Sequence, residues 1–204
     1  MTARRPEVTP TATYRLQLGP GQGFADVAAR VDYLHALGVS HVYLSPVLQA
    51  TPGSTHGYDV VDHAQLSEDL GGAAAFDGLV GALAARGMGV VVDVVPNHMA
   101  VPTPATLNLP LWSVLRDGPA SPYAAWFDVE WDVPGQALLM PVLGRRIGEC
   151  LASGELVVDR SGPEPVLRYH EQVFPVRPGT EGLRLPELLD AQHYRLAYWR
   201  VGDE

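Results

Sequence analysis

Polar side chains that could bind a substrate or move a proton lie directly after an apolar run near the middle of the sequence. Asp93 interrupts the valines of residues 90–95, and Asn97 and His98 follow Pro96. Runs rich in β-branched residues are typical of parallel strands that are covered on both faces. Because proline cannot donate a hydrogen bond to a neighbouring strand, we expect this strand to end at Pro96. Asn97 and His98 would then lie at the carboxyl edge of the sheet, where α/β enzymes carry their functional residues.

Asp93 is unusual because it is a carboxylate within an apolar run. Burying an unpaired carboxylate costs on the order of several kcal/mol, so its oxygens must accept hydrogen bonds or face a positive charge. Two interpretations remain open, a structural aspartate held by backbone amides or a residue of a functional site. His98 is likewise compatible with an ordinary loop histidine.

A second polar stretch, residues 56–63, lies upstream and includes Tyr58 and Asp59. The stretch is too polar to be buried throughout its length, so we expect a loop of functional interest. Tyr58 is compatible with an ordinary half-buried tyrosine and with a ring that binds a ligand.

The residues before Met99 alternate between strand-like and helix-like patterns. A strand, helix, strand, helix, strand order requires parallel strands with right-handed crossovers, in either a closed barrel or an open sheet. Glycines at the ends of the helical patterns are typical helix terminators. The expected strands are residues 11–18, 39–47 and 90–95, and the expected helices are residues 24–37 and 71–86, ending at Gly38 and Gly87.

The sequence changes character after Met99. Prolines and tryptophans become frequent, and short alternating runs occur at residues 137–143, 155–159 and 165–176. These features predict an irregular, β-rich lobe with turns at residues 159–162 and 178–179. The closing segment is helical at first, with Pro186 in the first turn. We therefore divide the chain into residues 1–99, 100–184 and 185–204.

Composition excludes several classes of function. The 204 residues carry a formal charge of −9 and their arginines are scattered, which argues against nucleic acid binding. A single cysteine, Cys150, forms neither an intrachain disulfide nor a thiolate metal site, and favours the cytoplasm. No apolar run is long enough to cross a bilayer, so we expect no membrane partner. We also expect no metal and no cofactor.

The order of these motifs resembles that of the α-amylase superfamily. Asp93, Asn97 and His98 match its Asp-x-x-x-Asn-His motif on the third strand, Gly57-Tyr58-Asp59 precedes it, and a lobe follows at once. The resemblance implies the first three strands of a (β/α)8 TIM barrel followed by an inserted, irregular β-rich B domain. A narrower similarity is to the maltooligosyltrehalose synthase family within that superfamily, and residues 13–17, 43–46, 53–59 and 192–200 carry it.

The resemblance also implies roles for individual residues. His98 would hydrogen-bond the sugar in the subsite where cleavage occurs, and Asn97 would hold the loop that enters the B domain. Asp93 would brace an arginine of the fourth strand beside the nucleophile. Tyr58 would form the stacking floor of the subsite, and Asp59 would hydrogen-bond or brace nearby. The asparagine that Asn97 matches is a calcium ligand in some amylases, but no further carboxylate cluster accompanies Asn97 here.

The family's retaining mechanism needs a nucleophile and an acid/base carboxylate about 5 Å apart. In the family these carboxylates come from the fourth and fifth strands, and no residue here lies in a matching motif. We therefore expect no catalytic carboxylate in this chain, with both beyond Glu204. The chain would be an amino-terminal portion of a longer enzyme and inactive when made alone.

The implied activity is an isomerase reaction of trehalose biosynthesis. It converts the reducing-end α-1,4 bond of a maltooligosaccharide into an α,α-1,1 bond by intramolecular transglucosylation, and a trehalohydrolase is a possible functional partner. A hydrolytic amylase or a trehalohydrolase is the alternative enzyme. A non-catalytic, glucan-binding fragment is the alternative from another class.

Overall fold

The computed structural model describes residues 9–133 and 135–203. The chain divides into two units, Met1–Ala100 and Val101–Glu204. Three parallel strands form the main sheet of the first unit. The strands are β1 (Thr13–Leu16), β2 (His41–Leu44) and β5 (Gly89–Val92), and they pair in the order β1-β2-β5. Both pairs are parallel, which confirms the predicted pairing.

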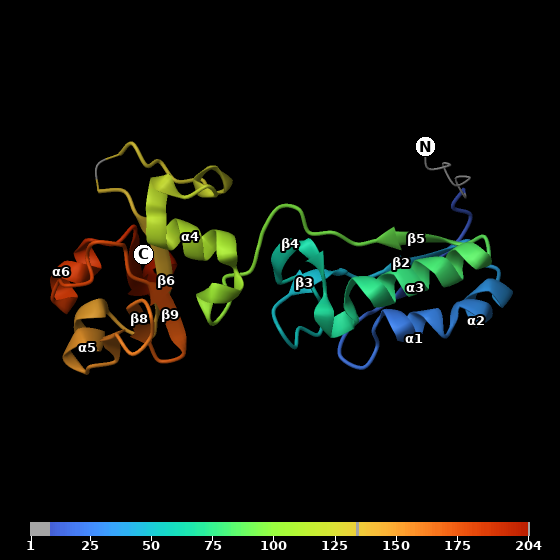
Figure 1. Ribbon diagram of the computed structural model, residues 1–204, viewed down its shortest axis with the longest axis horizontal. Helices are drawn as coiled ribbons and strands as arrows, with labels where there is room; N and C mark the ends of the chain where they lie inside the picture. The colour runs from blue at the N-terminus through green and yellow to red at the C-terminus, as the bar shows by residue number, and fades with distance from the viewer. Residues whose placement is uncertain (1–8, 134, 204) are drawn as a thin grey trace. The chain divides into compact units, whose positions relative to one another are not determined.

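Helices cover one face of this sheet, as Figure 1 shows. They are α1 (Phe24–Ala28), α2 (Val31–Ala36) and α3 (Gly72–Ala85). Their buried side chains pack with Val42 and Leu44 of β2. The single helix predicted over residues 24–37 was wrong, because Arg30 leaves the helical region at φ −104° and ψ 0° and separates α1 from α2.

The third strand is shorter and more exposed than its sequence predicted. β5 ends at Val92 rather than at Pro96, and the N–H of Asp93 makes a last bond of 3.0 Å to the carbonyl of Leu44. Val91 and Val92 are each 38% exposed, so coverage on both faces was also wrong. The physical reason is position, because β5 pairs only with β2 among the described residues and lies at a sheet edge.

The polar stretch 56–63 is only partly a loop. β3 (Leu48–Ala50) and β4 (Val60–Leu66) form an antiparallel hairpin, followed by the 3₁₀ helix η1 (Glu68–Leu70). Val60 and Val61 are buried in this hairpin. Val60 and Val61 are adjacent and do not form the alternating pattern by which a strand is recognised. The loop prediction was therefore wrong from Val60 onward.

The second unit combines two small sheets with three helices. β10 (Tyr194–Tyr198) pairs in parallel with β6 (Leu138–Leu143), and β7 (Leu156–Asp159), β8 (Val166–Tyr169) and β9 (Gln172–Pro175) form an antiparallel sheet. The helices are α4 (Leu109–Asp117), α5 (Ile147–Ala152) and α6 (Leu185–Asp190). The 3₁₀ helices are η2 (Ala105–Leu107), η3 (Gly118–Ala120), η4 (Ala124–Trp126) and η5 (Trp199–Asp203).

The predicted strand runs of this unit are confirmed, with the run at residues 165–176 divided into β8 and β9, but α4, α5 and β10 were missed. The frequent prolines suggested an irregular lobe, yet Pro110 occupies the first turn of α4, where a backbone N–H would have no partner within the helix. The side chain of Asn108 caps the same helix by accepting the N–H of Leu111 at 3.0 Å. A proline-rich segment can therefore be helical when its proline follows a capping residue.

The motif at residues 192–200 contributes Tyr194 and Leu196 to the core of the second unit. Gln192 is buried and accepts the N–H of Arg177 at 2.7 Å. The hydroxyl of Tyr194 donates to the carbonyl of Pro175 at 2.8 Å, and burial raises the pKa of that hydroxyl.

Within residues 9–133 and 135–203, no helix is both long and apolar enough to cross a membrane.

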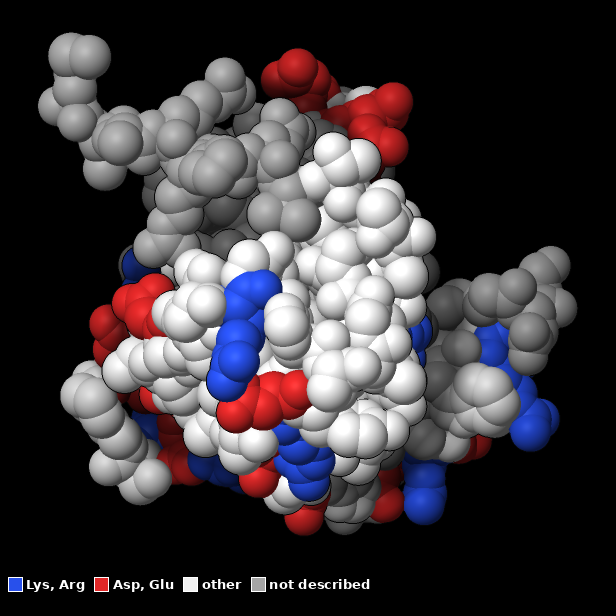
Figure 2. Space-filling view, turned by 90° about the vertical axis from the view of Figure 1, so that its right-hand side faces the viewer, with Lys and Arg blue, Asp and Glu red and all other residues white. Residues whose placement is uncertain are grey.

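Charges of both signs are mixed on one face of the protein. On the face in Figure 2, arginine side chains lie among aspartate and glutamate side chains, and uncharged residues occupy most of the view. In the first unit Arg86 pairs with Asp32 at 2.7 Å. This face has no continuous basic field of the kind that tracks a phosphate backbone.

Candidate functional site

The face of the main sheet opposite the helices carries the candidate site. Arg15, Tyr43 and Val91 are register partners across β1, β2 and β5, so their side chains point to the same face. Asp93 follows Val91 by two residues and shares that face. The alternate residues Val42 and Leu44 face the helices and are fully buried. The strand period thus separates a packed face from a polar one.

A tight loop between β3 and β4 positions Tyr58 over this face. Gly57 has φ +77°, and a Cβ there would lie 3.0 Å from the carbonyl oxygen of Pro46, so only glycine fits. Asp59 accepts the hydroxyls of Thr51 and Ser54 from the same loop. Asp59 is therefore a loop brace, and its contact with a sugar stays a prediction.

Tyr58 and Asp93 are brought together by the fold. The hydroxyl of Tyr58 donates to Oδ2 of Asp93 at 2.8 Å, and the hydroxyl of Tyr43 donates to the same oxygen at 3.2 Å. The bond to Asp93 raises the pKa of Tyr58, because ionising the phenol would remove the donor and place two anions in contact. Asp93 thus has two tyrosine partners, and its predicted arginine partner stays a prediction.

Arg15 completes the group. Its guanidinium lies 3.5 Å from the Tyr58 hydroxyl and 5.5 Å from the centre of the Tyr43 ring. The bond to Tyr58 is the main reason that the pKa of Arg15 is raised. Sequence reasoning assigned no role to Arg15 or Tyr43. The strand period alone could not have found them, but once the strand pairing is known it places both on the face of Asp93.

His56 also contacts Tyr58 and was missed. Its ring stacks on the Tyr58 ring at a centroid distance of 6.1 Å and an interplanar angle of 23°. Nδ1 of His56 accepts the backbone N–H of Tyr58 at 3.1 Å. The ring of Tyr58 is nevertheless exposed, with 39% of the residue's surface accessible.

Asn97 and His98 lie in the exposed segment after β5. Nδ1 of His98 is 3.1 Å from Oδ1 of Asn97. In a neutral ring this contact keeps the hydrogen on Nδ1 and leaves Nε2 free to accept a bond. In the described part of the chain, no hydrogen bond or ring contact joins His98 to Tyr58 or Asp93, and no three metal-binding side chains come together.

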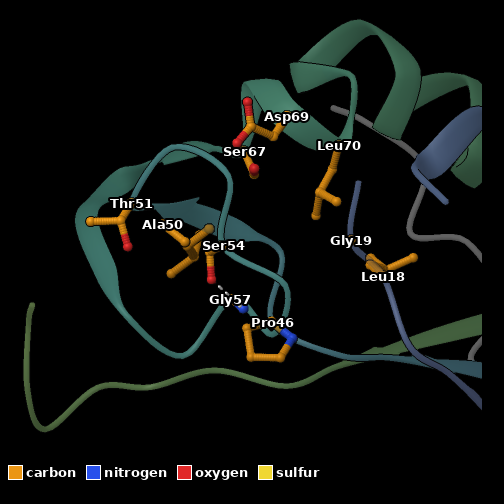
Figure 3. Close-up of a pocket in the computed structure, with 11 residues that line it drawn as sticks. Leu18, Gly19, Pro46, Ala50, Thr51, Ser54, Gly57, Ser67, Asp69 and Leu70 are labelled. Atoms are coloured by element: carbon orange, nitrogen blue, oxygen red, sulfur yellow. Dashed lines mark hydrogen bonds between the residues drawn. The ribbon is translucent and has the colours of Figure 1, made fainter. Parts of the chain in front are cut away.

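A small cavity is lined in part by Ser54 and Gly57, as Figure 3 shows. Its lining includes Leu18, Pro46, Ser54, Gly57 and Leu70. Its volume of about 10 Å³ is that of a single water site. Small organic ligands need pockets of roughly 300 Å³ or more, so the cavity cannot hold a sugar. The exposed face formed by Tyr58 and its neighbours is the candidate binding surface.

The arrangement can bind and orient a ligand. The exposed Tyr58 ring is held at its hydroxyl by two side chains, which makes it a fixed apolar surface against which a sugar's C–H face can stack. Asp93 already accepts two tyrosine hydroxyls, which suits a supporting role better than attack on a substrate.

Comparison with known proteins places this chain in a family. The model of the alpha-amylase catalytic domain matches residues 17–131, more than half of the chain. A putative maltooligosyl trehalose synthase of Mycobacterium tuberculosis is 41% identical over 94% of the chain and 24% of its own length. The maltooligosyltrehalose synthase structure from Arthrobacter ramosus is 43% identical with a TM-score of 0.84, over 94% of this chain and 24% of that one.

An intracellular maltogenic amylase of Bacillus subtilis is 35% identical, but over only 54% of the chain and 17% of its own length. The chain spans about a quarter of the length of the synthases. Its fold is of the α/β, TIM-barrel type that these neighbours share. The chain belongs to the alpha-amylase catalytic-domain family.

Proposed function

We propose that the natural protein containing this chain is a maltooligosyltrehalose synthase, an isomerase of trehalose biosynthesis. The extent of the similarity supports this assignment. The synthase of Mycobacterium tuberculosis is similar over 94% of the chain, whereas the maltogenic amylase is similar over 54%. The synthase similarity thus includes much of the second unit. That difference favours a transglucosidase over a hydrolytic amylase.

In this proposal β1, β2 and β5 are the first three strands of a (β/α)8 barrel. Helices on one face of the sheet, and polar side chains on the other, are what a barrel wall requires. Residues 100–184 would form the inserted B domain, and residues 185–204 would return toward the fourth strand.

The sugar would bind over the open face of the sheet. Tyr58 would be the stacking floor, and Nε2 of His98 would accept a bond from a sugar hydroxyl. Asp59 would brace the loop of Tyr58, or itself bind the sugar. Asp93 and Asn97 would support Tyr58 and His98, in agreement with their contacts at 2.8 and 3.1 Å.

The reaction would proceed through a covalent glycosyl-enzyme. A nucleophilic carboxylate would attack the anomeric carbon of the last α-1,4 bond while a second carboxylic acid protonates the departing oxygen. The released glucose would turn and return its anomeric hydroxyl to the same carbon, giving up a proton to the second carboxylate. Water must be excluded during this turn, because hydrolysis would otherwise compete.

Cellular context follows from this chemistry. The substrate would be a maltooligosaccharide or glucan end, and a trehalohydrolase would release trehalose from the product. Because Cys150 is the only cysteine, which fits a reducing compartment, the protein would act in the cytoplasm, without a membrane or nucleic acid partner.

Product analysis of the natural protein with maltopentaose tests the proposal. An intramolecular rearrangement leaves the mass of the sugar unchanged and removes its reducing end. A hydrolase instead adds water, shortens the sugar and increases the number of reducing ends, which would overturn the proposal. Saturable binding of the sugar without turnover would favour a glucan-binding protein and would also overturn it.

A further inference from the structure

Tyr58 presents an exposed ring that side chains from other segments hold in place. The Asp93 carboxylate binds its hydroxyl from one side at 2.8 Å. The His56 ring also stacks on Tyr58, but it belongs to the same loop and so does not tie the ring to the sheet. A second contact from a different element therefore decides how well the ring is fixed.

Arg15 supplies that second contact and is itself held in place. Its NH1 group donates to Oε1 of Gln17 at 3.0 Å, and its guanidinium lies 5.5 Å from the centre of the Tyr43 ring, within the range of a cation–π interaction. Its NH2 group is 3.5 Å from the Tyr58 hydroxyl, at the outer limit of a hydrogen bond.

These contacts form a closed circuit of four side chains. Arg15 donates to Tyr58, Tyr58 donates to Asp93, Tyr43 donates to Asp93, and Arg15 lies over the ring of Tyr43. The members come from β1, β2, the end of β5 and the loop before β4. Loss of any one of these side chains should therefore loosen the aromatic ring of Tyr58, because its position depends on contacts with more than one strand.

We propose that Arg15 is a positioning residue that fixes the Tyr58 ring for stacking against the sugar. The inference rests on the proposed function, in which Tyr58 is the floor of the cleavage subsite. Arg15 acts through Tyr58 and need not touch the sugar. Its contribution should therefore vanish when the ring of Tyr58 is absent.

A double-mutant cycle in the natural protein, with maltopentaose as substrate, tests the inference. Arg15→Met should lower kcat/KM by about three- to tenfold, the range that one ordinary hydrogen bond gives. Arg15→Lys, which keeps a cationic donor, should recover part of the loss. In the Tyr58→Ala background, Arg15→Met should have no further effect. Arg86→Met is the matched control, because Arg86 is a half-exposed arginine of the same unit paired to Asp32.

A second readout does not depend on activity. The pKa of the Tyr58 phenol can be followed by NMR of tyrosine labelled at Cζ, with Tyr58→Phe giving the assignment. Arg15 favours the phenolate, so Arg15→Met should raise that pKa further. Arg86→Met should leave it unchanged.

The outcomes separate this inference from the function on which it rests. A raised phenol pKa with a non-additive kinetic loss supports it. An unchanged pKa in Arg15→Met, or additive losses in the double mutant, overturns it. An impaired Tyr58→Ala with a fully active Arg15→Met overturns the inference alone. Normal kinetics in Tyr58→Ala instead overturns the proposed role of Tyr58, and the inference falls with it.

Discussion

The phenolic oxygen of Tyr58 lies 2.8 Å from Oδ2 of Asp93, although 35 residues separate them in the chain. The bond joins the loop before β4 to the end of β5. The family resemblance implies that Tyr58 binds the ligand and that Asp93 is a supporting residue. The hydrogen bond shows that Asp93 holds the hydroxyl of Tyr58.

The ring and the hydroxyl of Tyr58 should make separable contributions. Tyr58→Ala removes the stacking surface and should weaken sugar binding by on the order of 1 kcal/mol or more. Tyr58→Phe keeps the ring but loses the bond to Asp93, so its effect should be smaller. Isothermal titration of the natural protein with maltopentaose measures both. Tyr33→Phe, at an exposed position of α2, is the control. Equal losses in the two Tyr58 variants would contradict the stacking role.

His98 should contribute more to turnover than to affinity. If Nε2 binds the sugar most strongly in the transition state, His98→Ala should lower kcat by about tenfold, with a smaller change in KM. Steady-state kinetics of the natural protein provides the measurement. His35→Ala, on the exposed side of α2, should be indistinguishable from the wild type. A variant of His98 with normal kcat would show that this histidine is an ordinary loop residue.

The sequence was most informative where one pattern had one structural meaning. The helical repeat that ends at Gly87 gave α3, and the apolar run before Asp93 gave a parallel strand in the correct order. The sequence was less informative where the exposure of a residue depends on its tertiary neighbours. The exposure of Val91 depends on which neighbours β5 has, and a one-dimensional pattern cannot express this.

The site was predicted in part for a related reason. The family resemblance identified Tyr58 and Asp93 as candidates, but it carried no information about their mutual contact. Arg15 and Tyr43 contribute through register across strands, which requires knowing the pairing in advance. His56 acts through its ring and one backbone acceptor, and no spacing rule marks such a contact.

Asp159 should make the second unit sensitive to acid. The hydroxyl and N–H of Ser161, followed by Arg168, lower the pKa of Asp159 from 3.8 to about 2. Because the folded-state pKa is lowered, this carboxylate stabilises the fold above its unfolded-state value, and the effect is lost as the pH falls through the folded value.

Asp159→Asn should therefore lower the unfolding midpoint most near neutral pH, and the difference from the wild type should shrink as the pH falls from 3.8 to about 2. Thermal unfolding across a pH series measures this. Arg168→Met keeps the Ser161 donors and should have a smaller effect. A difference that does not change with pH would contradict the electrostatic explanation.

A polypeptide of residues 1 to 204 should not transform maltooligosaccharides when made alone. Asp93 is occupied by two tyrosine donors, and β1 and β5 each pair with one strand among the described residues. An exposed sheet edge favours self-association, so size-exclusion chromatography should accompany the assay. Turnover that is abolished by a substitution within these residues would show that the catalytic carboxylates are among them.

Intramolecular transfer is the central claim, and an isotope experiment tests it most directly. Maltopentaose carrying ¹³C at the anomeric carbon of its reducing glucose is incubated with the natural protein and an excess of unlabelled glucose, and the product is examined by NMR. The account predicts that the label is retained in full at an anomeric carbon of the new α,α-1,1 bond, because the released glucose never leaves its subsite. Labelled glucose in solution, or unlabelled glucose in the product, would contradict it.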